Sequence, residues 1–129
     1  MAQDSTENRN AMSFPELIAW AWRETPPVHK SATNLLIHLF AVPLFVIGNL
    51  LVVPGIFFNH WLLLGAPLCV ALSLALQKLG HSLEQVPVHP FTGVRDFLRR
   101  LYAEQFCNFW RFLFSGQWYA SLMARDRSA

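Results

Sequence analysis

The sequence predicts an all-α fold: an integral membrane helical hairpin of two spans with flanking interfacial amphipathic helices. The first observation is a run of 47 residues between Lys30 and Lys78 that contains no Asp, Glu, Lys or Arg. A run of that length fits two membrane-spanning helices and a short turn. The second is the composition, 53% hydrophobic and 14% charged, against roughly 25% charged in a soluble domain. The third is the number of Phe (11) and Trp (5) residues, which favour the membrane–water interface.

The segment before the hairpin divides into a tail and a short helix. Residues 1–12 are polar and are predicted to be a disordered tail, so that 13–129 forms a single helical membrane domain. Ser13, with Glu16 three positions later, has the pattern of a capping box and predicts a helix start. Prolines 26–27 end this helix, because the residue before a proline avoids the helical conformation.

The charge-free run supplies the two spans. The first is expected over residues 33–53, which at 1.5 Å per residue give roughly 31 Å, about one hydrocarbon thickness. Pro43 is expected to bend it. Residues 53–59 contain a Pro-Gly pair and are predicted to form the turn, and the second span is expected over residues 60–79.

From Val94 onward, apolar and aromatic residues alternate with arginines at helical spacing. This pattern predicts an amphipathic helix at the membrane surface, although a helix packed into a core would have the same pattern. Basic residues precede and follow the hairpin and are missing from its turn, so the positive-inside rule places both termini in the cytoplasm. The membrane would be a bacterial inner membrane or one resembling the endoplasmic reticulum. A net charge of +2 without a basic stripe argues against nucleic-acid binding.

A hairpin returns both ends of the run to one side of the membrane, so His29 and His38 should lie beside His81 and Glu84. Asn34 precedes His38 by four residues and shares its helical face. Taken singly, each histidine has an ordinary structural explanation, as a hydrogen-bonded, helix-end or solvated side chain. Taken together, neutral imidazoles with a nearby carboxylate are the ligands that iron, manganese and zinc use.

Two roles for Glu84 remain open. It could complete a site of two histidines and one carboxylate, with His29 outside it. It could instead accept a hydrogen bond from a ligating imidazole. His60 lies at the opposite end of the hairpin and cannot join the site, while the spacing of His89 carries no signal. The two cysteines, Cys69 and Cys107, have neither metal-ligand nor redox spacing.

Two segments resemble motifs of the fungal 2-hydroxy fatty acid dioxygenase family. The first motif is matched by the segment His29-Lys-Ser-Ala-Thr-Asn-Leu-Leu-Ile-His-Leu-Phe-Ala-Val-Pro43. Gly80-His-Ser-Leu-Glu84, followed by Pro87, is similar to the second motif of that family. Ala41 stands where the fungal pattern has Gly, and Glu84 follows His81 by three residues instead of four. The likeness extends over residues 28–118, and the two histidine-centred motifs are its specific part.

The resemblance implies an Fe2+-dependent membrane enzyme of fatty-acid α-oxidation. Such an enzyme converts a long-chain 2-hydroxy fatty acid and O2 into the acid one carbon shorter and CO2. His29, His38 and His81 would be the metal ligands, with Asn34 and Glu84 in catalytic roles. The acyl chain would lie between the spans or in the surrounding membrane lipid. Lys30, Arg95 or Arg99 could hold the substrate carboxylate, although such charges are more often only interfacial.

Other functions fit parts of the same sequence. A small membrane scaffold or partner subunit would use the histidines for hydrogen bonds between helices. A b-type haem protein would need His38 and His81 to face each other across a porphyrin, and it would leave Asn34, Glu84 and His29 without roles. A soluble helical bundle would have to bury an unusually uncharged hairpin. Two spans alone would enclose a metal ion only in part, and a second copy of the chain could complete the enclosure, which favours a homodimer.

Overall fold

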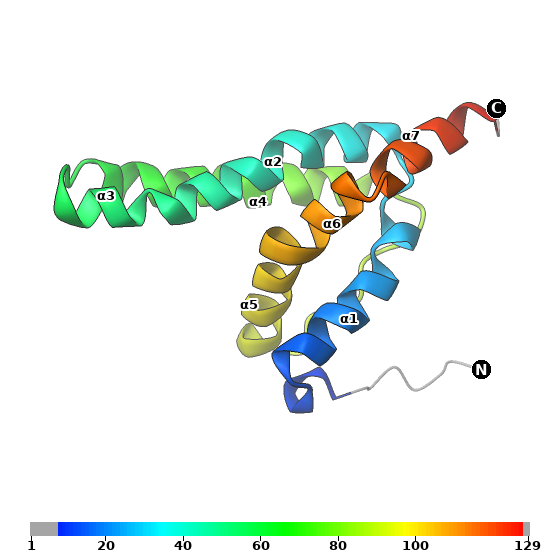
Figure 1. The fold of residues 1–129 in the computed structure, drawn as a ribbon, viewed down its shortest axis with the longest axis horizontal. Helices are drawn as coiled ribbons and strands as arrows, with labels where there is room; N and C mark the ends of the chain where they lie inside the picture. The colour runs from blue at the N-terminus through cyan, green and yellow to red at the C-terminus, as the bar shows by residue number, and fades with distance from the viewer. Residues whose placement is uncertain (1–7, 128–129) are drawn as a thin grey trace.

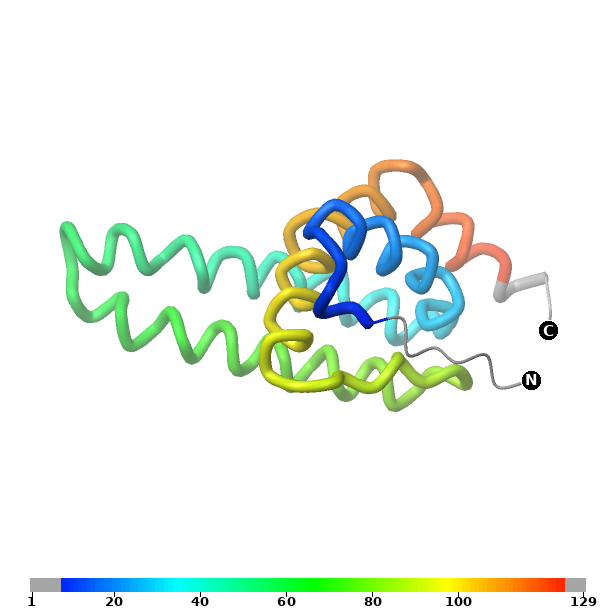
Figure 2. Tube along the Cα trace, turned by 90° about the horizontal axis from the view of Figure 1, so that it is seen from below, coloured from blue at the N-terminus to red at the C-terminus, as the bar shows by residue number. Residues whose placement is uncertain are grey.

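The computed structural model describes residues 8–127, and within that range every element is helical. Two long antiparallel helices form a hairpin, and shorter helices pack against the part of it that includes the end where it begins and ends (Figures 1 and 2). The elements of the hairpin are α2 (Ala32–Leu50), α3 (Val52–Phe57) and α4 (Leu62–Ser82). The remaining elements are η1 (Arg9–Ala11), α1 (Phe14–Glu24), η2 (Pro26–Val28), α5 (Val94–Ala103), η3 (Glu104–Asn108), α6 (Phe109–Phe114) and α7 (Gln117–Arg127).

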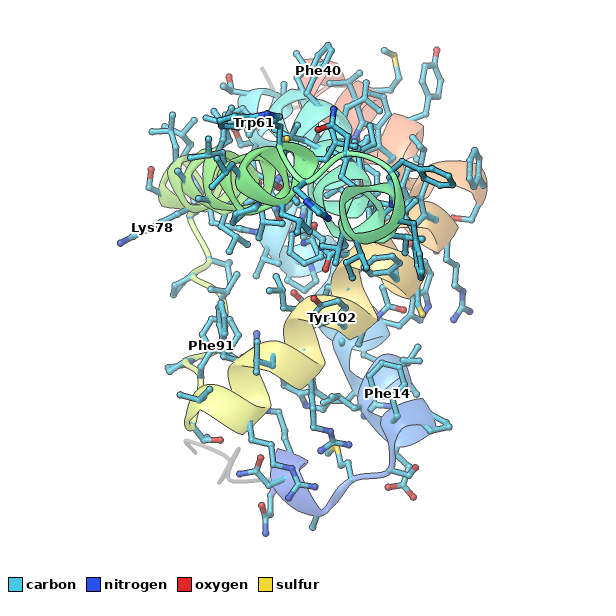
Figure 3. All side chains as sticks on the ribbon, turned by 90° about the vertical axis from the view of Figure 1, so that its left-hand side faces the viewer. Phe14, Phe40, Trp61, Lys78, Phe91 and Tyr102 are labelled. Atoms are coloured by element: carbon cyan, nitrogen blue, oxygen red, sulfur yellow. The ribbon has the colours of Figure 1, made fainter. Side chains whose placement is uncertain are left out.

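Both arms of the hairpin are long and apolar enough to cross a membrane. Ala32–Phe57 has 26 residues and Leu62–Ser82 has 21, and only 28% and 17% of their most apolar windows are buried within the protein. The core helix of a soluble protein would bury most of such a window, so the exposed apolar surface favours a membrane-embedded hairpin. Figure 3, which views the hairpin from its turn, shows Phe40 on the side of the hairpin opposite α1 and α5; 74% of its surface is exposed.

The turn of the hairpin lies later than the sequence predicted. The segment 53–59 was expected to be the turn, but α3 continues the helical path to Phe57 and the chain reverses over residues 58–61. Pro54 occupies the first turn of α3, where its missing N–H removes no helical hydrogen bond. Pro43 likewise lies inside α2 without ending it.

The helix predicted to start at Ser13 is confirmed. The Ser13 hydroxyl accepts the Glu16 N–H, and the Glu16 carboxylate accepts the Ser13 N–H, so α1 begins with a complete capping box. Order begins earlier than the predicted tail of residues 1–12 allowed. Residues 9–11 form a short 3-10 helix, and Arg9 is buried against Asp96 of α5, 2.9 Å away. Residues 1–7 lie outside the described part of the chain.

The amphipathic segment from Val94 forms a nearly continuous helical stretch of α5, η3 and α6. Asp96, Arg100 and Leu101 are buried on its inner face, so this face packs as a core helix does. Val94 and Leu98 leave an apolar outer face exposed, as expected of a helix at a membrane surface. The η3 segment is a π-helical turn, and such turns recur at functional sites.

Polar contacts attach these helices to the hairpin at three points, one of which is the bond from the Tyr102 hydroxyl of α5 to the Asn49 side chain of α2, at 2.6 Å. Gln105 of η3 and Gln77 of α4 donate to each other's amide oxygens, at 2.7 and 2.9 Å, in a buried pair. The Trp118 indole of α7 donates to the carbonyl of Leu35 in α2. Buried polar groups satisfied in this way fix one packing arrangement, so the helices outside the hairpin have a defined position relative to its spans.

Candidate metal site

The structure brings together the three histidines predicted as metal ligands. His29 follows η2 in the entry loop, His38 lies in the second turn of α2, and His81 lies in the last turn of α4. Their ring centroids are 4.7–4.9 Å apart in all three pairs. One nitrogen from each ring can be chosen so that all three lie within 4.8 Å of one another. Three imidazole nitrogens at this separation can converge on a single metal ion.

Backbone carbonyls orient two of the rings. The Nδ1 atom of His29 lies 2.7 Å from the carbonyl oxygen of Thr25, and that of His38 lies 3.0 Å from the carbonyl of Asn34. A carbonyl oxygen only accepts hydrogen bonds, so each Nδ1 carries the proton and each Nε2 keeps its lone pair. Metal-ligating histidines are commonly held by such a bond on the other nitrogen.

The third ring has an unmet nitrogen. Nδ1 of His81 is buried and has no hydrogen bond of ordinary geometry among the described residues. The Val28 carbonyl oxygen lies near this ring, but its geometry falls short of a hydrogen bond to Nδ1. A buried polar nitrogen without a partner costs free energy. The donor set therefore fits a bound metal ion, which three neutral imidazoles would hold.

The charge state of His29 also suits a metal ligand. Burial, together with the neighbouring His81, lowers the pKa of His29 to about 4, and the hydrogen bond to Thr25 only partly opposes this shift. The ring is neutral at pH 7 as a result, so no proton has to be displaced before its lone pair can bind a metal.

Glu84 and Asn34 form a clamp beside the triad. The Oε1 atom of Glu84 accepts the N–H groups of Lys30 and Ser31, both at 2.9 Å, and the Asn34 side-chain amide at 2.7 Å. Both predicted roles of Glu84 involve direct contact with the metal or an imidazole, whereas these three bonds go to the start of α2. A carboxylate there complements the helix dipole. Through Asn34, whose backbone carbonyl accepts from His38, the clamp supports one ligand.

Gly80 leaves room for this clamp, and apart from its place in the second motif no sequence signal pointed to it. A Cβ added at Gly80 would overlap the Oδ1 atom of Asn34. Only glycine lets α4 approach α2 this closely. The close approach places His81, the next residue, against the other two histidines.

The triad faces a cavity of about 50 Å³, which has room for a few water-sized molecules. The other walls come mainly from α1, the link before α5, α5 itself, η3 and α6, and their polar residues include Glu24, His89, Arg100, Glu104 and Asn108. The sequence pattern pointed to none of these five, because the arginines and acids of α5 and η3 matched an amphipathic surface helix. His89 pairs with Glu24 at 2.7 Å. His60 is exposed in the turn at the other end of the hairpin.

Comparisons of this chain with protein-family models, curated proteins and solved structures gave no match.

Proposed function

We propose that this chain is an Fe2+-dependent membrane dioxygenase of fatty-acid α-oxidation, which converts a long-chain 2-hydroxy fatty acid and O2 into the one-carbon-shorter acid and CO2. The observation that carries the proposal is the convergence of His29, His38 and His81 at the mouth of an apolar hairpin. The resemblance of the two histidine motifs to the fungal dioxygenases supplies the reaction and the choice of iron.

The donor set supports a non-haem metal over a haem. Three nitrogen donors suit Fe2+, and they also suit zinc or manganese. The ring centroid of His29 is 4.8 Å from that of His38 and 4.9 Å from that of His81. His29 is thus equally distant from both rings and lies close to the plane that separates them. A porphyrin held between His38 and His81 would need that plane.

The chemistry is balanced without a further cofactor. A 2-hydroxy acid and O2 contain the same atoms as the shorter acid, CO2 and water together, and the four electrons that reduce O2 come from the substrate. Fe2+ held by the three histidines would supply the redox chemistry that couples oxidation of the substrate to reduction of O2. The three histidines would hold the metal as neutral ligands, and the enclosing helices would limit the access of water.

The hairpin suits an amphiphilic substrate. Its spans expose apolar side chains such as Phe40 and Leu68, along which an acyl chain can lie while its head group reaches the histidines. Lys30 and Lys78 flank the charge-free run at the triad's end, and the turn has no basic residue. By the positive-inside rule, the triad and both termini lie on the cytoplasmic side of a bacterial inner membrane or a membrane resembling the endoplasmic reticulum.

The test is an assay of the purified protein in detergent, loaded anaerobically with Fe2+ and 2-hydroxypalmitate. Oxygen is then admitted, and the products are identified by mass spectrometry. We expect pentadecanoate to form in an iron-dependent manner. His29→Ala, His38→Ala and His81→Ala should each lose bound iron and product, because each removes one of three ligands.

His60→Ala is the matched control, because it removes an exposed histidine from the far end of the hairpin. It should retain both iron and activity. Equal losses in all four variants would contradict a clustered site. Bound iron without product would mean that the substrate is wrong, and a protein without affinity for iron, zinc or manganese would favour a structural role for the histidines.

A further inference from the structure

The cavity beside the triad has a second polar end, built from a cation that the sequence pattern assigned to the membrane surface. Among the described residues that line the cavity, Arg100 is the one permanent positive charge. Only 3% of its surface is exposed. Burying a guanidinium is costly unless its charge and its N–H groups are used, so the position of Arg100 calls for an explanation.

The Arg100 side chain is fixed in place but incompletely hydrogen-bonded. Its guanidinium carbon lies 5.1 Å from the ring of Trp20 and 4.3 Å from the ring of Phe91, and Nη1 donates to the carbonyl of His89 at 2.7 Å. The Nε–H group is buried without an acceptor in the described part of the chain. The nearest carboxylate oxygen, on Glu104, is 3.7 Å away, which is too far for a hydrogen bond.

The same cavity contains an unmet acceptor. The side-chain amide nitrogen of Asn108 donates to the carbonyl of Ile18 at 3.1 Å, and this bond fixes which way the amide faces. Its Oδ1 atom is then left buried, and no residue between 8 and 127 donates to it. Asn108 ends the π-helical turn η3. Two residues that line the cavity thus have a charged donor and a neutral acceptor, and neither atom has a hydrogen-bond partner among the described residues.

We propose that Arg100 and Asn108 bind the head group of the substrate, a 2-hydroxy acid. The Arg100 Nε–H donates a hydrogen bond to the carboxylate of the acid, and Asn108 Oδ1 accepts a hydrogen bond from its 2-hydroxyl group. This inference rests on the proposed function for the identity of the ligand. A carboxylate beside a hydroxyl presents the complementary acceptor and donor. The cavity of about 50 Å³ takes such a head group and leaves the alkyl chain outside.

The charges around Arg100 permit an anion to bind. Glu24 is paired with His89 at 2.7 Å. Burial raises the pKa of Glu104 to about 7, although Arg100 acts in the opposite direction. A raised pKa favours the neutral form of Glu104, which repels a substrate carboxylate less than the ionised form.

The cations that the sequence suggested for this role have other positions. Arg99 donates to the backbone carbonyls of Arg9 and Met12 and so joins α5 to the N-terminal segment. Lys30 and Arg95 do not line the cavity. Arg99 and Arg100 are neighbours of equal charge, and only Arg100 lines the cavity with the histidines. Arg99 is for this reason the matched control.

The experiment measures binding to the full-length protein in detergent, with metal removed by a chelator so that only the protein's own groups contribute. The probes are 2-hydroxypalmitate, palmitate and hexadecane-1,2-diol, which separate the contribution of the carboxylate from that of the hydroxyl. Binding is followed by tryptophan fluorescence, because Trp20 lies against Arg100. The variants are Arg100→Gln, Arg100→Lys, Asn108→Leu and Arg99→Gln.

We expect the unmodified protein to bind 2-hydroxypalmitate about tenfold or more tightly than the diol, as a hydrogen bond to a charged group allows. Arg100→Gln should remove this preference, and Arg99→Gln should keep it. Asn108→Leu should remove the preference for 2-hydroxypalmitate over palmitate and leave the preference for acid over diol. If Arg100→Gln fails to fold, the preference of Arg100→Lys for the acid over the diol tests the proposal instead. This variant keeps the charge and loses the Nε–H group.

Equal binding of acid and diol by the unmodified protein, or an unchanged preference in Arg100→Lys and Arg100→Gln, would overturn the proposal. Failure of the proposed function has a different result. Arg100-dependent binding of the acid without turnover on Fe2+ would support the head-group site and reject the reaction. Turnover with no dependence of acid binding on Arg100 would support the reaction and reject this site.

Discussion

Each imidazole of the triad depends on a different piece of backbone, and this gives the site its geometry. His29 and His38 are held by the carbonyls of Thr25 and Asn34, each four residues earlier in the chain. His81 has no such bond, and its place is set by the close approach of Gly80 to Asn34. Two rings are thus fixed locally, whereas the third is fixed by packing between helices. A change at the Asn34–Glu84 clamp should therefore act on His38 and His81, whereas His29 keeps its local bond to Thr25.

Glu84 provides the sharpest test of that argument. Glu84→Ala removes the acceptor for two backbone N–H groups and the Asn34 amide, and we expect it to lower the free energy of unfolding by about 2–5 kcal/mol. Glu84→Gln keeps one acceptor oxygen and should lose less. Thermal unfolding in detergent measures both. Each folded variant should still bind one metal ion on its three histidines. A variant with unchanged stability that no longer binds metal would instead make Glu84 a ligand.

At the scale of elements, the N-terminal segment is joined to α5 by an ion pair across 87 positions of sequence. Arg9 and Asp96 are 4% and 1% exposed, and their closest atoms are 2.9 Å apart. Asp96 also accepts the Thr92 N–H. Burial alone would raise the pKa of Asp96, but the bonds from Arg9 and Thr92 outweigh burial and lower it below 3.8. This pair anchors the ends of α1 and α5 that lie farthest from the hairpin.

The lowered pKa of Asp96 predicts how stability changes with pH. A group with a depressed folded-state pKa contributes stability above its unfolded pKa and loses it as the pH falls, so the melting temperature should decrease below about pH 4.

Arg9→Leu leaves the buried Asp96 carboxylate without its ion-pair partner and should lower the free energy of unfolding by about 3–5 kcal/mol at pH 7. Arg95→Leu removes an equal charge from an exposed neighbour of Asp96 and should have little effect. The measurement is thermal unfolding in detergent at several pH values, and equal losses in both variants would contradict a specific pair.

At the scale of the whole molecule, the parts predictable from sequence are those with a local or periodic signature. A charge-free run identifies the spans, and a hairpin then brings His29, His38 and His81 to one end. The Arg9–Asp96 pair and the position of Arg100 in the cavity depend on contacts between distant segments. Arginine on an amphipathic helix looks the same in sequence whether it faces lipid head groups or a cavity. The clamp function of Glu84 was missed because a carboxylate near histidines resembles a ligand.

The projecting hairpin makes a prediction about topology. The short helices pack along the hairpin from its open end as far as Asn49 of α2, which Tyr102 of α5 contacts, and α3 and the turn extend beyond them (Figure 1). The 26 residues of α2 and α3 give roughly 39 Å, more than the roughly 30 Å of a hydrocarbon core, so the turn should emerge on the far side of the membrane. In a background with Cys69→Ala and Cys107→Ala, His60→Cys should react with an impermeant maleimide added to intact cells. Gln117→Cys, exposed near the triad's end, should react only after permeabilisation. Labelling of both positions from the same side would mean that the hairpin does not cross the membrane, and the triad would then need another route to its lipid substrate.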